Sequence, residues 1–452
     1  MLAKLFLLCL PFCAVGHVGL LGGFDSNAGL LLLFPLLGVQ IITGQAHTAL
    51  LGRNAQAALL RRYGMILSLA ATLTVLNGAR LLVPVNIGLD YGLVPQHKAM
   101  VTAIVPLFIF ALMVALYTLA RHMDRMQFQR TIVASFWIVV GYSALQVSHY
   151  LVGNPLYDLL HPVVEGTRDT GHLSYLQHFG RMNGSAQEPA EFGKLLVVYF
   201  LPWLVFPLDG VRRPVATIAA IVLSLATLSI IGILLVALAL VMILTSRQMA
   251  GGLRLSALAL AYLVLLAAVI VGDSVLQGFF VRLTALEEDA STIIRTTYNL
   301  AALQLVAENP WLGVGWSNEL FLFPEKIAHI AHLWEVQNDI RLGNALTAKS
   351  LALRLMMYLG LPLFAYFAYA TARVFLFPPH EANHWEPTVH DRARARFVIM
   401  LFTLAAMIDG GILTSFFGWA CLIFPLAMLA PCPASAAAGR MSSDPQFLRG
   451  TA

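Results

Sequence analysis

Apolar segments of about 20 residues recur along the whole chain, and short polar links separate them. A helix needs about 20 apolar residues to cross a membrane, where only helices and closed barrels satisfy their own backbone. The pattern therefore predicts an all-α, polytopic membrane protein. The expected spans lie near residues 2–21, 27–46, 64–84, 98–120, 131–151, 191–208, 215–246, 255–272, 346–375, 395–411 and 412–430.

Basic residues gather in some of the links and are absent from others. The links 22–26 and 85–97 contain no Lys or Arg. Short loops rich in Lys and Arg stay in the cytoplasm. The links expected there carry Arg53, Arg61, Arg62, Arg121, Arg125, Arg130, Arg212, Arg213, Arg247, Arg254, Arg373, Arg392, Arg394 and Arg396.

The segment 215–246 decides on which side of the membrane the later loops lie. Its 32 residues would form a helix of about 48 Å, against a hydrocarbon core of about 30 Å. Two short passes, broken near Ser229–Gly232, would place the arginines at both ends in the cytoplasm. The alternative is one long tilted helix. We favour the broken pair, which gives about twelve transmembrane helices with both termini in the cytoplasm.

This topology places two long loops on the periplasmic face. The predicted organisation is 1–151, N-terminal transmembrane helices; 152–190, periplasmic loop; 191–273, transmembrane helices including the broken pair; 274–345, large periplasmic loop; 346–431, C-terminal transmembrane helices; and 432–452, cytoplasmic tail.

Composition agrees with this class of protein. The chain is 59% hydrophobic and 11% charged, whereas a soluble domain carries roughly 25% charged residues. The net charge of +5 does not indicate nucleic-acid binding, because the arginines lie mainly in short loops. The four cysteines show neither metal-ligand spacing nor a disulfide framework. The first apolar segment could serve as a signal peptide; we interpret it as a retained span.

The first periplasmic loop returns to the membrane through RMNGSAQEPAEFGK, residues 181–194. Arg181 opens this stretch, and Pro189 suits the first turn of the next helix. Glu188 and Glu191 suit the positive end of a helix dipole, so capping is one explanation for them. Gly184 and Gly193 would permit a tight turn and close helix packing.

The second loop contains a predicted helix that Asp289 or Ser291 would cap. Its apolar stripe is Ile294, Tyr298, Ala301 and Leu305, and Asn309-Pro310 ends it. Arg295 is expected in its first turn, where a cation opposes the dipole, which indicates an anion site. Alternatively Arg295 pairs with nearby carboxylates. Arg282, at the membrane edge, could meet a lipid phosphate or simply extend to the interface.

The stretch AENPWLGVGWSN, residues 307–318, predicts a turn onto the membrane surface, with Trp311 and Trp316 at the headgroups. His329 and His332 would share one helix face, as a general base or as plain surface residues; no third metal ligand is fixed. Lys349 and Arg354 enter the next span, where charges need partners or a polar cavity.

In this order, these pieces resemble the O-antigen polymerase and ligase (Wzy/WaaL) superfamily over residues 175–365. The similar strings are R-x-x-G-x-x-x-E-P-x-x-F-G at 181–193, R-x(12)-R at 282–295, N-P-W-L-G-V-G-W at 309–316 and G-N-A-L-(x)9-Y-L-G-L at 343–361. The paired short helices of 215–246 are also similar to that family.

The resemblance implies a metal-independent, GT-C-type glycosyltransferase that needs no cofactor. Its donor and acceptor would be undecaprenyl-pyrophosphate-linked oligosaccharides, used at the periplasmic face of the bacterial inner membrane. It implies that Arg181, Arg282 and Arg295 stabilise the pyrophosphate, with Arg354 and Asn344 at the substrate site. His332, His329 and Glu188 are the candidate catalytic residues. Membrane lipid, a chain-length regulator and a flippase are the implied partners, and nucleic acid is not.

Two departures favour a polymerase over a ligase. Gly343 precedes Asn344 where the ligases have a histidine, and E-P-x-x-F-G at 188–193 is more similar to polymerases. The Ser-Arg often found in the broken helix pair is also absent, since Ser229-Ile230 stands there. A ligase to lipid A-core or protein remains the first alternative. A transporter of lipid-linked glycan and a non-catalytic scaffold subunit are the others.

Overall fold

Every regular element in the described part of the chain is a helix, which confirms the all-α prediction. The computed structural model describes residues 1–12, 27–52, 54–80, 95–164, 181–186, 188–211, 213–246, 290–334, 336–337, 346–378, 388–411 and 416–430. The first helices are α1 (Leu2–Cys9), α2 (Leu30–Ile42), α3 (Gln45–Leu51), α4 (Ala55–Arg80), α5 (Pro95–Thr102), α6 (Ile104–His122), α7 (Arg125–Val152) and α8 (Pro155–Val164).

The middle of the chain contains an irregular helix and a helix pair. In the first, α10 (Pro189–Lys194) runs through the π-helical stretch η2 (Leu195–Phe200) into α11 (Leu201–Val205). The pair is α12 (Pro214–Ala226) and α13 (Ile230–Thr245). The rest comprises α16 (Ala290–Glu308), η3 (Asn318–Phe321), α17 (Phe323–Lys326), η4 (Ala328–Ile330), α19 (Leu351–Leu376), α20 (Val389–Ile408) and α21 (Phe416–Met428).

Several of these helices can cross a membrane. By length and composition, four segments qualify within the described residues: Ala55–Ala79, Ala99–His122, Arg125–Val152 and Leu351–Leu376. The pair α2 and α3, bent by 76°, is a fifth candidate, and α12, α13 and α21 are apolar but shorter. The chain is thus a multi-span membrane protein. The total of about twelve spans and the domain boundaries stay predictions, because 255–272 and other segments lie outside the described residues.

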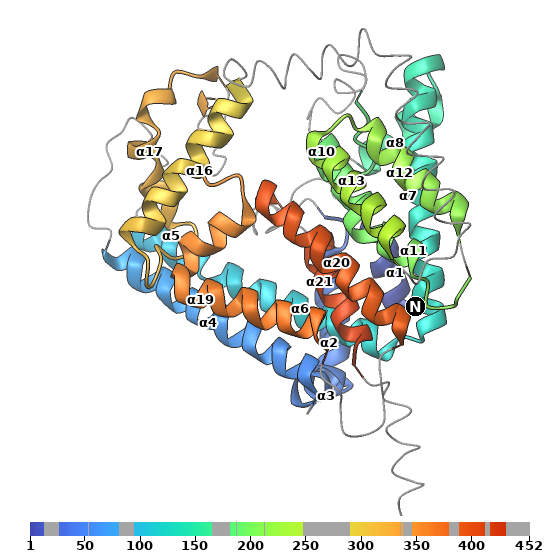
Figure 1. Ribbon diagram of the computed structural model, residues 1–452, viewed down its shortest axis with the longest axis horizontal. Helices are drawn as coiled ribbons and strands as arrows, with labels where there is room; N and C mark the ends of the chain where they lie inside the picture. The colour runs from blue at the N-terminus through green and yellow to red at the C-terminus, as the bar shows by residue number, and fades with distance from the viewer. Residues whose placement is uncertain are drawn as a thin grey trace, which may run out of the picture.

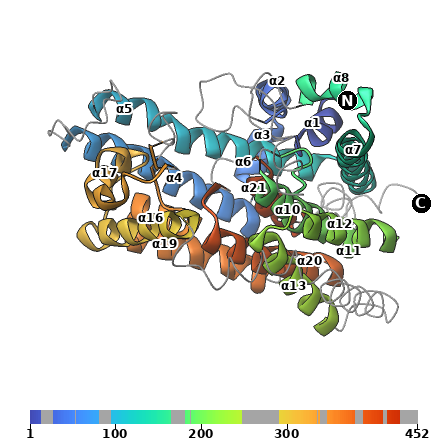
Figure 2. The ribbon, with the colours of Figure 1, turned by 90° about the horizontal axis from the view of Figure 1, so that it is seen from above.

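One helix forms the centre of the bundle. Every residue of α21, from Phe416 to Met428, is buried. It packs against α6 on one side and α20 on the other, and Figures 1 and 2 show it enclosed by the surrounding helices. In Figure 1, α16 and α17 lie at one end of the molecule and α10, α12 and α13 at the other, with α20 between them.

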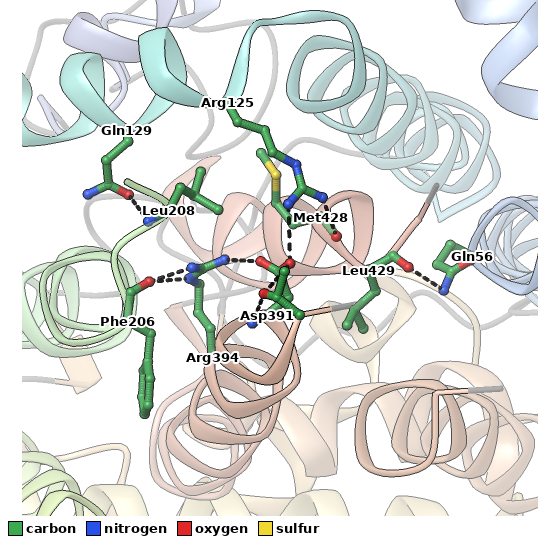
Figure 3. A network of polar contacts seen from close by, with 10 residues as sticks. Gln56, Arg125, Gln129, Phe206, Leu208, Asp391, Arg394, Met428 and Leu429 are labelled. Carbon is green, nitrogen blue, oxygen red and sulfur yellow. Dashed lines mark hydrogen bonds and ion pairs between the residues drawn. The ribbon is translucent and has the colours of Figure 1, made fainter. Parts of the chain in front are cut away.

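A buried polar network joins helices at the start of α20 (Figure 3). The Arg394 side chain is 1% exposed and donates to Asp391 at 2.9 Å and from Nε to the Phe206 carbonyl at 2.9 Å. Arg125 of α7 donates to the same carboxylate at 3.2 Å and to the Met428 carbonyl at 3.1 Å. A buried charge needs such partners, so the network fixes α7, α11, α20 and α21 to one another.

Candidate functional site

The break in the helix pair lies where the sequence indicated. The helix α12 ends at Ala226 and α13 begins at Ile230. Leu228 between them has a φ of 46°, in the left-handed region that non-glycine residues rarely adopt. Gly193 of α10 packs against this break, since a Cβ on it would lie 3.2 Å from the Gly232 Cα. Close packing at Gly193 is therefore confirmed.

Arg181 is attached to the same break. Its Nε donates to the Thr227 carbonyl at 3.2 Å, and the backbone N–H of Met182 donates to the Ala226 carbonyl at 3.3 Å. The C-terminal carbonyls of a helix attract a cation. The stretch that returns from residue 181 is thus attached to the end of α12, and the Arg181 side chain remains partly exposed. Gly184, with a φ of 52°, makes the tight turn that was predicted.

An ion pair lies next to this contact along α10. Lys194, whose side chain is 5% exposed, pairs with the carboxylate of Asp409, whose side chain is 23% exposed. Asp409 is the residue after the end of α20, and it also accepts the backbone N–H of Gly411 at 2.9 Å. The pair thus joins the first turns of the α10 helix to the end of α20.

Arg354 approaches the end of α20 from another helix. It lies in the first turn of α19 and donates from Nε to the Ala348 carbonyl at 2.6 Å. A Cβ on Gly410 would lie 2.7 Å from that Nε, so only glycine allows the approach. The backbone N–H of Leu351 donates to the Asp409 carbonyl at 3.2 Å. The start of α19 and the end of α20 therefore bring Arg354 beside the Lys194–Asp409 pair.

A buried carboxyl group lies on the other side of Arg354. The Tyr358 hydroxyl donates to Glu319 Oε1 at 2.5 Å, and Glu319 is 1% exposed. Its Oε2 has no hydrogen-bond partner among the described residues. Burial raises the pKa of Glu319, while the Tyr358 hydrogen bond and the Arg354 charge oppose part of that rise. The site thus combines three cations with carboxyl groups held close to them.

The glycine turn at 309–316 is part of the scaffold of this site. Its Val314 N–H donates to the Met357 carbonyl at 2.8 Å, and the Leu361 N–H of α19 donates to the Pro310 carbonyl at 2.7 Å. These two groups would bond each other in an unbroken helix, but α19 kinks at Gly360, where φ is 74°. The turn fills the kink and satisfies both groups.

Glycines allow the turn to approach both neighbouring helices. Gly313 and Gly315 have φ of 64° and 82°. A Cβ on Gly313 would lie 2.5 Å from the Met357 carbonyl, and one on Gly315 would lie 2.7 Å from the Thr74 Cα of α4. The predicted close backbone approach is confirmed. The expected interfacial position of Trp316 is wrong: it is 4% exposed and packs on Tyr358, with ring centroids 4.8 Å apart.

The helix α16 agrees with its predicted stripe and ends at Glu308 as expected. The four stripe residues are at most 3% exposed. The helix already includes Ala290, so Arg295 lies in the second turn and not in the first, which weakens the argument from the helix dipole. Arg295 is exposed, and Asn299 on its face accepts the Lys349 N–H at 3.0 Å.

The three candidate catalytic residues are all exposed. Glu188 occupies the cap position before Pro189, where a carboxylate suits the helix dipole, although its side chain makes no capping hydrogen bond. His329 lies in the short 3₁₀ helix η4, which ends at Ile330 before His332. The prediction that both histidines share one helix face is therefore wrong; both remain accessible from solvent.

Part of the predicted site cannot be placed. Arg282 and Asn344 lie outside the described residues, as do Glu287, Glu288 and Asp289, the suggested partners of Arg295. Among the described residues, no group of three or more His, Cys, Asp or Glu side chains could hold a metal ion. The structure therefore joins Arg181 and Arg354 through the residues between them, and leaves the other predicted residues separate or unplaced.

Sequence reasoning missed Lys194, Asp409, Glu319 and Tyr358. A signal was available for the first two, because each is a charge at the end of an expected span, where charged residues need partners. The same argument predicts partners for Lys349 and Arg354. Glu319 gave no such signal, since a carboxylate in a polar loop is ordinary and only the fold buries it.

Taken together, these features define a polytopic helical membrane protein with a cationic site between a broken helix pair and two helix ends. Residues 215–368 match the family model described as O-antigen ligase. This match supports the O-antigen polymerase and ligase (Wzy/WaaL) superfamily that the motifs predicted. It does not separate the polymerase branch from the ligase branch. No curated protein matches the chain.

Proposed function

We propose that the chain is a membrane glycosyltransferase that polymerises undecaprenyl-pyrophosphate-linked oligosaccharide repeat units at the periplasmic face of the inner membrane. The family match supports glycosyl transfer of the O-antigen kind. The observation that carries the proposal is the meeting of Arg181, Lys194 and Arg354 at the ends of four helices. A pyrophosphate leaving group needs such a concentration of positive charge.

In this proposal an acceptor hydroxyl attacks the anomeric carbon of the donor sugar. The bond from that carbon to the pyrophosphate oxygen breaks, and its electron pair stays on the pyrophosphate. Arg181 and the neighbouring cations stabilise this charge without a metal ion, and Arg282 and Arg295 extend the same role. His332, with His329 behind it and Glu188 as a further candidate, accepts the hydroxyl proton. Arg354 and Asn344 position the substrate.

The ligase is the second candidate function, and the description of the matched family favours it. A ligase would move finished glycan to lipid A-core or protein, with the same donor and the same cations. A polymerase would act beside a flippase and a chain-length regulator, whereas a ligase acts after polymerisation. The two functions therefore leave different intermediates in the membrane.

A gel profile of surface and lipid-linked glycans from a strain that lacks the chain tests the proposal. Single repeats on the core or carrier indicate a polymerase, and long chains trapped on the carrier indicate a ligase. Complementation with Arg181→Ala is expected to lower product formation about a hundredfold, since a donor to a developing charge contributes roughly 3 kcal/mol. The matched control is Arg396→Ala, an exposed arginine near the other end of α20. An unchanged profile after deletion would contradict both functions.

A further inference from the structure

The ion pair between Lys194 and Asp409 has features that would allow Lys194 to release Asp409 and bind another anion. The lysine is almost fully buried, whereas the aspartate keeps 23% of its side chain exposed. The open side of the pair is therefore the side of the carboxylate. Within a membrane protein, an ionisable residue that is merely structural is uncommon, because lipid-like surroundings make its charge costly.

The backbone on both sides of the pair departs from regular structure. Lys194 is the last residue of α10, and the π-helical stretch Leu195–Phe200 follows at once. Such stretches are frequent at functional sites. Asp409 has left α20 and is followed by Gly410 and Gly411. The lysine ammonium is a compact charge on a flexible stem, so it can exchange partners with a small movement.

The pair lies between two cations that already belong to the candidate site. On one side, Gly193 precedes Lys194, and a Cβ on Gly193 would lie 3.4 Å from Thr227 Oγ1; the Thr227 carbonyl accepts a hydrogen bond from Arg181. On the other, Gly410 follows Asp409 and lies against the Arg354 guanidinium. Arg181 and Arg354 have backbone carbonyls among their acceptors, whereas Lys194 is paired with a carboxylate.

We propose that Lys194 is a further pyrophosphate-binding residue, which Asp409 holds in place until the donor arrives. On donor binding the Lys194 ammonium moves from the Asp409 carboxylate to a pyrophosphate oxygen. The carboxylate thus acts as a competing anion for the empty site. This inference rests on the proposed function and adds a residue and an exchange of partners to it. No covalent bond changes in the exchange.

Exchange and simple structural pairing predict different behaviour for the two single variants. If the pair only holds helices together, Lys194→Gln and Asp409→Asn behave alike: both lower the melting temperature and neither affects pyrophosphate binding directly. If Lys194 exchanges partners, Lys194→Gln weakens pyrophosphate binding, whereas Asp409→Asn removes the competing anion and strengthens it. The opposite directions separate the two explanations even when both variants are less stable.

The experiment uses the full chain in detergent micelles and farnesyl diphosphate as a water-soluble prenyl diphosphate. Binding is measured as a ligand-induced rise in melting temperature and by titration calorimetry. We expect Lys194→Gln to raise the Kd about tenfold or more, the loss of one charge-assisted hydrogen bond, and Asp409→Asn to lower it. The double variant Lys194→Asp with Asp409→Lys restores stability but not binding, because a carboxylate then stands at position 194.

A second ion pair of the chain provides the matched control. Lys326 and Glu308 pair at 2.5 Å, with side chains 19% and 52% exposed. Exchanging their charges is expected to leave the Kd unchanged. The proposed role of Lys194 is overturned if Lys194→Gln binds farnesyl diphosphate as tightly as the wild type. It is also overturned if the double variant Lys194→Asp with Asp409→Lys binds it as tightly as the wild type.

Failure of the proposed function has a separate signature. In that case the wild type shows no binding of farnesyl diphosphate, and Arg181→Ala leaves the glycan profile unchanged. If instead the wild type binds and Arg181→Ala does not, while both Lys194 variants bind normally, only the role of Lys194 is lost.

Discussion

At the scale of single residues, the Glu319 carboxyl group has an unusual environment for a loop residue. It is buried, accepts the Tyr358 hydroxyl and is close enough to Arg354 to interact with its charge, and burial raises its pKa. The folded protein therefore holds a proton on Glu319 more strongly than the unfolded chain does. Stability from this group is present at low pH, below the ordinary glutamate pKa, and decreases as the pH rises through the raised pKa of the folded state.

We therefore expect the melting temperature of the protein in detergent to fall as the pH rises from the ordinary glutamate range. Glu319→Gln should remove this part of the pH dependence, because the amide stays neutral and still accepts the Tyr358 hydroxyl. At pH 8 the variant should be at least as stable as the wild type. Differential scanning fluorimetry across pH measures this, and a Gln variant with the same pH slope as the wild type would contradict the assignment.

Some residues of the candidate site could be predicted from the sequence, whereas their partners could not. Arg181, Gly193 and Gly313 could be predicted, because an isolated arginine at the start of a helix-entry stretch and glycines at an expected turn or close packing contact have few ordinary explanations. The partners could not be predicted: Thr227 offers a backbone carbonyl, and Asp409 lies far along the chain. Trp316 was misplaced because tryptophan suits both a membrane interface and a buried stack, and only the fold decides between them.

At the scale of elements, the turn at 309–316 and the kink of α19 depend on each other. Gly313→Ala would place a Cβ 2.5 Å from the Met357 carbonyl at a φ of 64°. The expected cost is roughly 1–3 kcal/mol, and more if the turn leaves the kink. A lower melting temperature and reduced glycan transfer should follow together, because the turn supports the α19 segment that carries Tyr358 and Arg354.

Gly141→Ala is the matched control for that substitution. Gly141 lies within α7, and a Cβ there would meet nothing within 4 Å. Replacing a helical glycine by alanine stabilises by about 0.5–1 kcal/mol, so this variant should melt no lower than the wild type. Equal melting temperatures for the two variants would show that the turn carries no strain-sensitive contact.

For the broken pair α12 and α13, the sequence predicted the position of the break but not its backbone conformation. The excess length of 215–246 and the arginines at both of its ends favoured a break near Ser229–Gly232, within a few residues of its position at Thr227–Ser229. The left-handed conformation of Leu228 could not be predicted, because leucine normally avoids it. Leu228→Gly is expected to raise the melting temperature by relieving this strain, provided that the break is preserved. A lower melting temperature would mean that the leucine side chain contributes more than the strain costs.

At the scale of the whole molecule, α20 separates two polar clusters. The Arg125–Asp391–Arg394 network lies near its start and the Lys194–Asp409 pair just beyond its end. Asp409 lies 18 positions after Asp391, a helical rise of about 27 Å, which is close to the thickness of a hydrocarbon core. The predicted topology puts the first cluster at the cytoplasmic face and the second at the periplasmic face.

Cysteine labelling tests this sidedness. In a background without the four native cysteines, Glu188→Cys and His390→Cys introduce thiols at two exposed positions. A membrane-impermeant maleimide applied to spheroplasts should label Glu188→Cys at once and His390→Cys only after permeabilisation. Labelling of both positions from outside would mean that an even number of passes separates Glu188 from His390, as a single long helix for 215–246 would require.

The central position of α21 has a consequence for how the protein is made. This helix is buried over its whole length and packs against α6 and α20. It follows every other described helix in the sequence and therefore leaves the ribosome after them. The helices made earlier cannot close around a core that has not yet been synthesised. Until α21 enters the bilayer, the apolar groove that it fills is left to lipid. A chain that stops short of residue 416 would therefore be inserted but never completed, and would be recognisable to membrane proteases by that open centre.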